Sequence, residues 1–133
     1  MRLLIDHGSR VDTMDHTGRF AILHAVDSHS VDVLRMLLDA GASPNPQVPV
    51  IFFRSSPITA ASFGGLTEMV KLLCGKGANV NEENPEGRTA LQSVAIRGQD
   101  AECAAILVES GADINCISRN GWTALTTSIT YNN

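Results

Sequence analysis

The chain has 133 residues, of which 44% are hydrophobic, and a formal net charge of -4 at pH 7. This length and composition are typical of one packed domain. The acidic balance argues against nucleic acid as a partner, because nucleic-acid-binding domains usually carry a basic patch. No apolar run approaches the roughly 20 residues of a membrane span, and no signal-peptide pattern opens the chain, so we expect no membrane contact.

The cysteines do not form a metal or disulfide pattern. There are three of them, an odd number, with no CxxC pair and no histidine cluster at zinc-ligand spacing. They are Cys74, Cys103 and Cys116. We therefore expect reduced thiols, no metal or other cofactor, and a location in the cytoplasm or the nucleus.

Apolar segments that end at a glycine recur along the whole chain. These glycines are spaced by 33, 36 and 34 residues; they are Gly8, Gly41, Gly77 and Gly111. A second set of positions, at which the next apolar segment begins, is spaced by 36, 33 and 34 residues; its members are Phe20, Ser56, Thr89 and Thr123. Two independent signals in the same phase predict an array of internal repeats.

Each repeat begins with a short helix. Thr89 and Ser56 are good N-cap residues, because their hydroxyls can accept a hydrogen bond from an unpaired backbone N–H of the first turn. Pro57 follows Ser56 at the first helical position, where its missing N–H costs nothing. Small and apolar residues come next, which allows neighbouring helices to approach closely, and Gly65 and Gly98 end these helices.

A second helix and a polar turn complete the repeat. Apolar residues from Met69 to Leu73 are spaced to form one helical face, and Gly77 is suited to the left-handed conformation that ends a helix. The segment 84–87, Asn-Pro-Glu-Gly, predicts a β-turn. One helix pair cannot bury its apolar face alone, so the period predicts an all-α solenoid of stacked pairs.

These motifs resemble the ankyrin repeat family. The matching features are the closing sequences at 77–81 and 111–115, the helix starts at 56–58 and 89–91, and the turn glycines Gly18, Gly87 and Gly121. The resemblance covers a single domain over residues 1–133, with complete repeats at 15–47, 48–83 and 84–117. Residues 1–14 resemble the end of a preceding repeat and 118–133 the first half of a further one, so we expect a fragment of a longer array.

The chain departs from the family pattern at several positions. The family histidine that helps to join one repeat to the next is replaced by Leu23, Thr59, Gln92 and Thr126, so we expect a less stable array. Phe20 stands at a capping position, which costs about 1 kcal/mol if nothing compensates. His29 stands where a helix-ending glycine is usual, and an extra residue near Gln99 lengthens one inter-helix loop.

In ankyrin repeats, a turn-containing loop precedes each first helix, and we call these loops fingers. The resemblance implies binding of a protein partner at the finger tips and the concave face formed by the first helices. The positions that we predict to contact it are Arg19, Ile51, Phe52, Phe53, Arg54, Phe63, Arg88, Arg97, Arg119 and Trp122. The second finger, 46–55, is enlarged by three residues relative to the third and is rich in apolar residues. Exposed apolar surface often marks a partner site; the alternative is that this finger folds back onto neighbouring repeats.

Other positions also leave two interpretations open. Trp122 is an anchor for a partner or packs against a following repeat. The acidic residues Glu82, Glu83 and Glu86 either attract a basic partner or are simply solvent-exposed side chains of the third finger. The resemblance further implies that Asn45, Asn81 and Asn115 are sites of hydroxylation, while the simpler explanation is that each asparagine makes turn hydrogen bonds.

We therefore predict a monomeric protein-interaction module that belongs to an adaptor or scaffold, for example a substrate receptor of a ubiquitin ligase. The alternative is the regulatory ankyrin portion of a larger enzyme or ion channel. The four histidines all lie in the first quarter of the chain, without a matched nucleophile, and no Walker or dinucleotide-binding motif is present, so we do not expect an enzyme.

Overall fold

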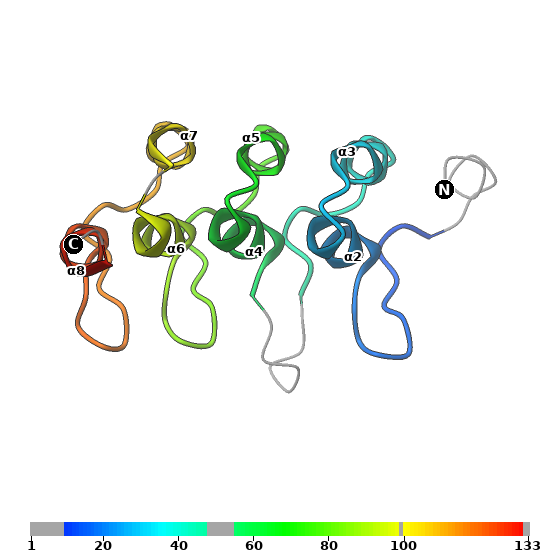
Figure 1. The fold of residues 1–133 in the computed structure, drawn as a ribbon. Helices are drawn as coiled ribbons and strands as arrows, with labels where there is room; N and C mark the ends of the chain where they lie inside the picture. Colours follow the sequence, from blue (N-terminus) through cyan, green and yellow to red (C-terminus); the bar gives the residue numbers. More distant parts are fainter. Residues whose placement is uncertain (1–9, 48–54, 99, 132–133) are drawn as a thin grey trace.

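The computed structural model describes residues 10–47, 55–98 and 100–131, which contain seven helices. The first helices of the repeats are α2 (Ala21–Asp27), α4 (Pro57–Gly64), α6 (Ala90–Arg97) and α8 (Ala124–Tyr131). The second helices are α3 (Val31–Asp39), α5 (Thr67–Gly75) and α7 (Ala101–Glu109). The two sets form parallel rows, and the fingers project from the row of first helices (Figure 1).

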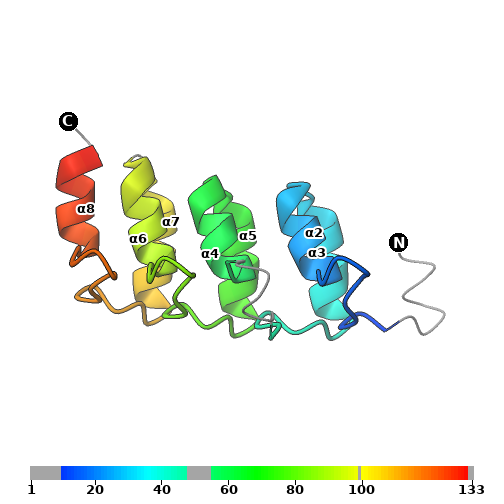
Figure 2. The ribbon, with the colours of Figure 1, turned by 90° about the horizontal axis from the view of Figure 1, so that it is seen from below.

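The predicted all-α solenoid is confirmed in the described residues, where the only β feature is a single bridge between Met14 and Phe20. Seen from below, α2, α4 and α6 each stand in front of the second helix of the same repeat, and the repeats follow one another along the stack to α8 (Figure 2). Residues 1–9, part of the predicted end of a preceding repeat, lie outside the described residues, as do most of the enlarged finger and Gln99.

The predicted helix starts are also confirmed. The hydroxyl of Ser56 accepts the N–H of Thr59, with Pro57 at the first helical position. The hydroxyl of Thr89 accepts the N–H of Gln92 at 3.4 Å, and the Gln92 side-chain oxygen accepts the N–H of Thr89 at 3.0 Å, so the two residues form a capping box. Phe20 makes no side-chain capping bond, and helix α2 lacks that stabilisation.

The first helices end in the left-handed conformation. Gly65 and Gly98 have φ angles of 67° and 72°, and His29 takes the same place after α2 with a φ of 55°. His29 is the only non-glycine residue with a positive φ in the described residues. The left-handed region costs an L-residue roughly 1–2 kcal/mol, so the missing glycine leaves strain in the first repeat.

The core lies between the two rows of helices. Ile22, Leu34, Ile58 and Leu73 are among its fully buried side chains. Helices α4 and α6 pack on each other, and Ala61 and Ala90 are fully buried there, which agrees with the role expected for small residues in the first helices.

Side-chain amides join each turn to the next repeat. The Asn45 side chain accepts the N–H of Asn79 at 2.7 Å and donates to the carbonyl of Gly77 at 3.0 Å. Asn81 repeats both bonds, at 2.7 Å to the N–H of Asp113 and 3.0 Å to the carbonyl of Gly111. These bonds account for the presence of asparagine at positions 45 and 81 without any modification, and hydroxylation stays a prediction.

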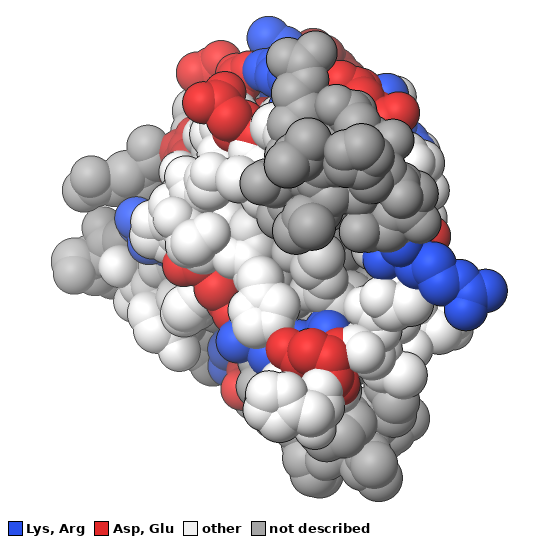
Figure 3. All heavy atoms as spheres, turned by 90° about the vertical axis from the view of Figure 1, so that its right-hand side faces the viewer, with Lys and Arg blue, Asp and Glu red and all other residues white. Residues whose placement is uncertain are grey.

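The end of the stack that carries α2 and α3 is viewed in Figure 3. Charged atoms gather near the upper edge of this view, on the side of α3, and a second group of acidic and basic atoms lies below the middle, with uncharged surface between them. Charge therefore does not dominate the described part of this end face.

Candidate protein-binding face

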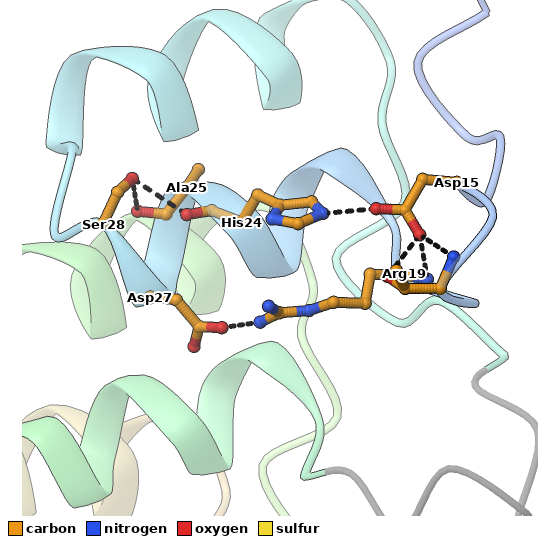
Figure 4. A network of polar contacts seen from close by, with 7 residues as sticks. Asp15, Arg19, His24, Ala25, Asp27 and Ser28 are labelled. Carbon is orange, nitrogen blue, oxygen red and sulfur yellow. Dashed lines mark hydrogen bonds and ion pairs between the residues drawn. The ribbon is translucent and has the colours of Figure 1, made fainter.

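The first finger is held together by one carboxylate. Asp15 Oδ1 accepts the backbone N–H of Thr17 at 2.7 Å and that of Arg19 at 3.1 Å (Figure 4). Asp15 Oδ2 lies 2.7 Å from Nε2 of His24 on α2, which joins the finger to the helix. The hydroxyl of Thr17, and then the imidazole of His24, hold the pKa of Asp15 well below its usual range.

The third finger uses an asparagine for the same purpose. Asn84 Oδ1 accepts the N–H groups of Glu86 and Arg88 at 3.0 and 2.9 Å. The N–H of Gly87 donates to the carbonyl of Asn84 at 2.8 Å, which confirms the predicted β-turn at 84–87. Because the turn is fixed at both ends, the Arg88 backbone has a defined position at the edge of the concave face.

Two arginines of this face are paired with carboxylates. Arg19 forms an ion pair with Asp27 at the end of α2, and the two side chains are 18% and 51% exposed (Figure 4). Arg88 Nη1 lies 2.7 Å from Glu86 Oε2, with exposures of 28% and 62%. In both pairs the arginine is the more buried partner, so the carboxylate is the charge that a ligand meets first.

A first cleft of about 340 Å³ lies between the first three repeats, and we call it the Phe63 cleft. Its lining residues are Asp27, Ser55, Thr59, Ala60, Phe63, Asn84, Glu86, Arg88 and Ser93. The Phe63 side chain is 56% exposed, which is unusual for so large an apolar group in a packed domain. The cleft therefore combines an accessible aromatic ring with two carboxylates.

A second cleft of about 290 Å³ follows it along the face, and we call it the aromatic cleft. Its lining residues are Arg88, Gln92, Ile96, Ser118, Asn120, Trp122, Thr127 and Tyr131. The rings of Trp122 and Tyr131 are 6.3 Å apart and tilted by 52°, a favourable aromatic geometry. Arg88 lines both clefts and separates them.

The structure brings together only some of the predicted contact residues. Phe63, Arg88 and Trp122 line the two clefts, and Arg19 lies behind Asp27. Arg97 donates to the carbonyl of Phe63 at 3.2 Å and so contacts the preceding repeat.

Arg119 packs on the third finger, where its side chain occupies the space that a Cβ on Gly87 would need. Arg97 and Arg119 thus make contacts within the array, and their role in binding stays a prediction. The predicted residues Ile51, Phe52, Phe53 and Arg54 lie outside the described residues.

The predicted contact residues do not include Tyr131 or Gln92. Tyr131 lies 34 residues after Arg97, which is one repeat period, so this spacing is the signal that would have identified it. Gln92 is 2% exposed, and its Nε2 donates to the carbonyls of Cys116 at 2.8 Å and Trp122 at 2.9 Å. It makes the inter-repeat contact expected of the missing histidine, so the third repeat does not lose that stabilisation.

Three further groups of the described residues have shifted pKa values, namely Cys103, Cys116 and Glu82. Burial, and then the nearby Asp100 carboxylate, raise the pKa of the Cys103 thiol to about 11. Burial also raises the pKa of Cys116 and that of Glu82. Among the described residues, no group of His, Cys, Asp and Glu side chains could hold a metal ion, and no helix is long and apolar enough to cross a membrane.

Comparison with known proteins agrees with this architecture. The family model described as "Ankyrin repeats (3 copies)" matches residues 58–133. The chain therefore belongs to the ankyrin repeat family, whose repeats are protein–protein interaction modules.

Several curated proteins share the repeats. The chain is 37% identical over 95 residues to "Ankyrin repeat domain-containing protein 37" of Bos taurus, an alignment that covers 71% of this chain and 58% of the relative. It is 33% identical over 90 residues to "B-cell lymphoma 3 protein homolog" of Mus musculus, covering 67% and 19%. It is 28% identical over 116 residues to "Potassium channel AKT2/3" of Arabidopsis thaliana, covering 87% and 14%. The chain thus spans only part of the relatives it matches.

Proposed function

We propose that this chain is the protein-binding module of an adaptor or scaffold and that it holds its partner at the finger tips and the concave face. The observation that carries this proposal is the pair of adjoining clefts, each with an accessible aromatic side chain. Burying one Phe side chain is worth about 1.5–3 kcal/mol, so Phe63 and Trp122 could anchor an interface. The ion pairs beside them supply charge that selects a partner.

Affinity capture with the intact protein tests this proposal. We expect proteins retained by the wild type to be lost from a Phe63→Ser, Trp122→Ser double variant, as identified by mass spectrometry. Val108→Ser is the matched control, because Val108 is a 41% exposed apolar residue on a second helix. An unchanged set of captured proteins in a folded double variant would contradict binding at the concave face.

The enlarged finger is tested separately. If Phe52 and Phe53 contact the partner, the Phe52→Ser, Phe53→Ser variant loses capture and keeps its melting temperature. A large fall in melting temperature would instead support packing of this finger onto the array. Subunits of a ubiquitin ligase among the captured proteins would identify the adaptor as a substrate receptor, which is one form of the same proposal.

A second candidate function is regulation of a larger enzyme or ion channel. It is favoured by the relatives, which include a potassium channel and the fission-yeast "Glycerophosphocholine phosphodiesterase gde1", where the match covers 8% of the relative. The sequence of the full-length transcript distinguishes the two functions. A membrane or catalytic domain in the same open reading frame would favour regulation, and a domain that recruits ligase subunits would favour the adaptor.

A further inference from the structure

The two clefts of the concave face differ in charge although they share a wall. The Phe63 cleft is lined by the carboxylates of Asp27 and Glu86 as well as by Arg88. In the aromatic cleft, Arg88 is the only charged lining residue. One end of this short groove is therefore acidic and the other is basic and aromatic.

The acidic end is open to a ligand. Asp27 is 51% exposed, whereas its partner Arg19 is 18% exposed and does not line the cleft. Glu86 is 62% exposed against 28% for Arg88. A cationic side chain that enters beside the exposed Phe63 ring would meet both carboxylates and the face of an aromatic ring, which together favour Lys or Arg.

The basic end favours the opposite chemistry. Trp122, Tyr131 and Ile96 offer an apolar wall for a large side chain. The guanidinium of Arg88 disfavours a cation there; its Nη1 is paired with Glu86, and its other N–H groups can donate to a carboxylate of the ligand. An aromatic residue next to Asp or Glu satisfies both features.

The arrangement of the clefts suits an extended peptide. The Phe63 cleft is lined by residues of the first three repeats, and the aromatic cleft by residues of the third repeat and of 118–131. Because Arg88 lines both clefts, they adjoin each other along the face. An extended peptide advances about 3 Å per residue, so a short segment that crosses the repeats can place one side chain in each cleft.

We propose that the concave face binds an extended peptide with two features. A Lys or Arg side chain enters the Phe63 cleft, and an aromatic residue flanked by Asp or Glu enters the aromatic cleft. This inference rests on the proposed function, because it specifies the partner of the same face. Arg88 lines both clefts and Glu86 only the Phe63 cleft, and this difference fixes the order of the charges along the peptide.

The test is selection from a displayed library of random linear peptides of about ten residues, long enough to span three repeats. We expect the enriched peptides to share a basic residue and an aromatic–acidic pair in a constant order and at a constant spacing. A synthetic peptide of the enriched sequence then serves as the probe in fluorescence anisotropy with the intact protein and its variants.

The variants separate the two ends of the groove. Asp27→Asn with Glu86→Gln should weaken binding about tenfold and reduce its dependence on salt. Trp122→Ser should weaken it at least about tenfold. Because Trp122 is half-buried, Tyr131→Ser, at a 55% exposed position, repeats the test with less risk to the fold. The controls are Glu68→Gln and Val108→Ser on the second helices, which should change the affinity less than about twofold.

The outcomes distinguish this inference from the function on which it rests. Enriched peptides that need Phe63 and Trp122 but lack the charge pattern would overturn the inference and leave the proposed function intact. Peptides that bind all variants equally, or a library with no enriched peptide, would also overturn the inference. In both of those cases the capture experiment decides the proposed function independently.

Discussion

The side-chain amide of Gln92 joins the third repeat to the fourth. Its Nε2 lies 2.8 Å from the carbonyl oxygen of Cys116 and 2.9 Å from that of Trp122, while its Oε1 accepts the N–H of Thr89 at 3.0 Å. The buried Gln92 side chain thus caps the N-terminus of α6 and fixes the position of the finger that carries Trp122. The aromatic cleft depends on this finger, so stability and binding are coupled at Gln92.

Gln92→Ala should destabilise the protein by about 1–3 kcal/mol, because it leaves buried backbone groups without a partner. The free energy of unfolding in urea measures the effect. Gln92→His is the matched variant: an imidazole keeps a ring N–H donor at this position and should recover part of the loss. Equal stability of the wild type and Gln92→Ala would show that solvent replaces these bonds.

His29→Gly should stabilise the protein by roughly 0.5–1 kcal/mol. Glycine removes the cost of the left-handed conformation, and its greater freedom in the unfolded chain offsets part of the gain. His16→Gly is a suitable control, since His16 is an exposed finger residue without a positive φ and should gain nothing. A lower melting temperature for His29→Gly than for the wild type would disprove the assignment of strain.

Asp15 should make folding sensitive to acid. Its pKa is lowered in the folded protein, so the stability it contributes is present above the ordinary carboxyl pKa and is lost as the pH falls. The wild type should therefore lose more stability than Asp15→Asn between about pH 5 and pH 2. Urea denaturation at a series of pH values gives the two curves.

Thr17→Val provides the matched comparison for Asp15, because the Thr17 hydroxyl is the largest cause of the lowered pKa. It should reduce the acid-dependent loss in part and leave the carboxylate in place. If the curves of the wild type and Asp15→Asn run parallel throughout this range, the Asp15 hydrogen bonds do not stabilise the folded finger.

Most of the fold follows from local signals. The glycine period, the caps at Ser56 and Thr89 and the turn at 84–87 each describe interactions within a few residues, and all were predictable. The sequence shows that Gln92 replaces the family histidine, and from this it predicts a loss of stability. Its compensation depends on carbonyls 24 and 30 residues away, which no local pattern reveals.

In the candidate binding face, too, some features follow from the sequence and others only from the tertiary structure. The sequence alone determined the array, its register and the concave positions Arg19, Phe63, Arg88 and Trp122, because a periodic chain repeats its geometry with its residues. Only the tertiary structure decided that Arg19 is shielded behind Asp27, that Arg88 lines two clefts and that Tyr131 joins Trp122. Those relationships arise where one repeat meets the next, and they depend on side-chain directions that periodicity does not encode.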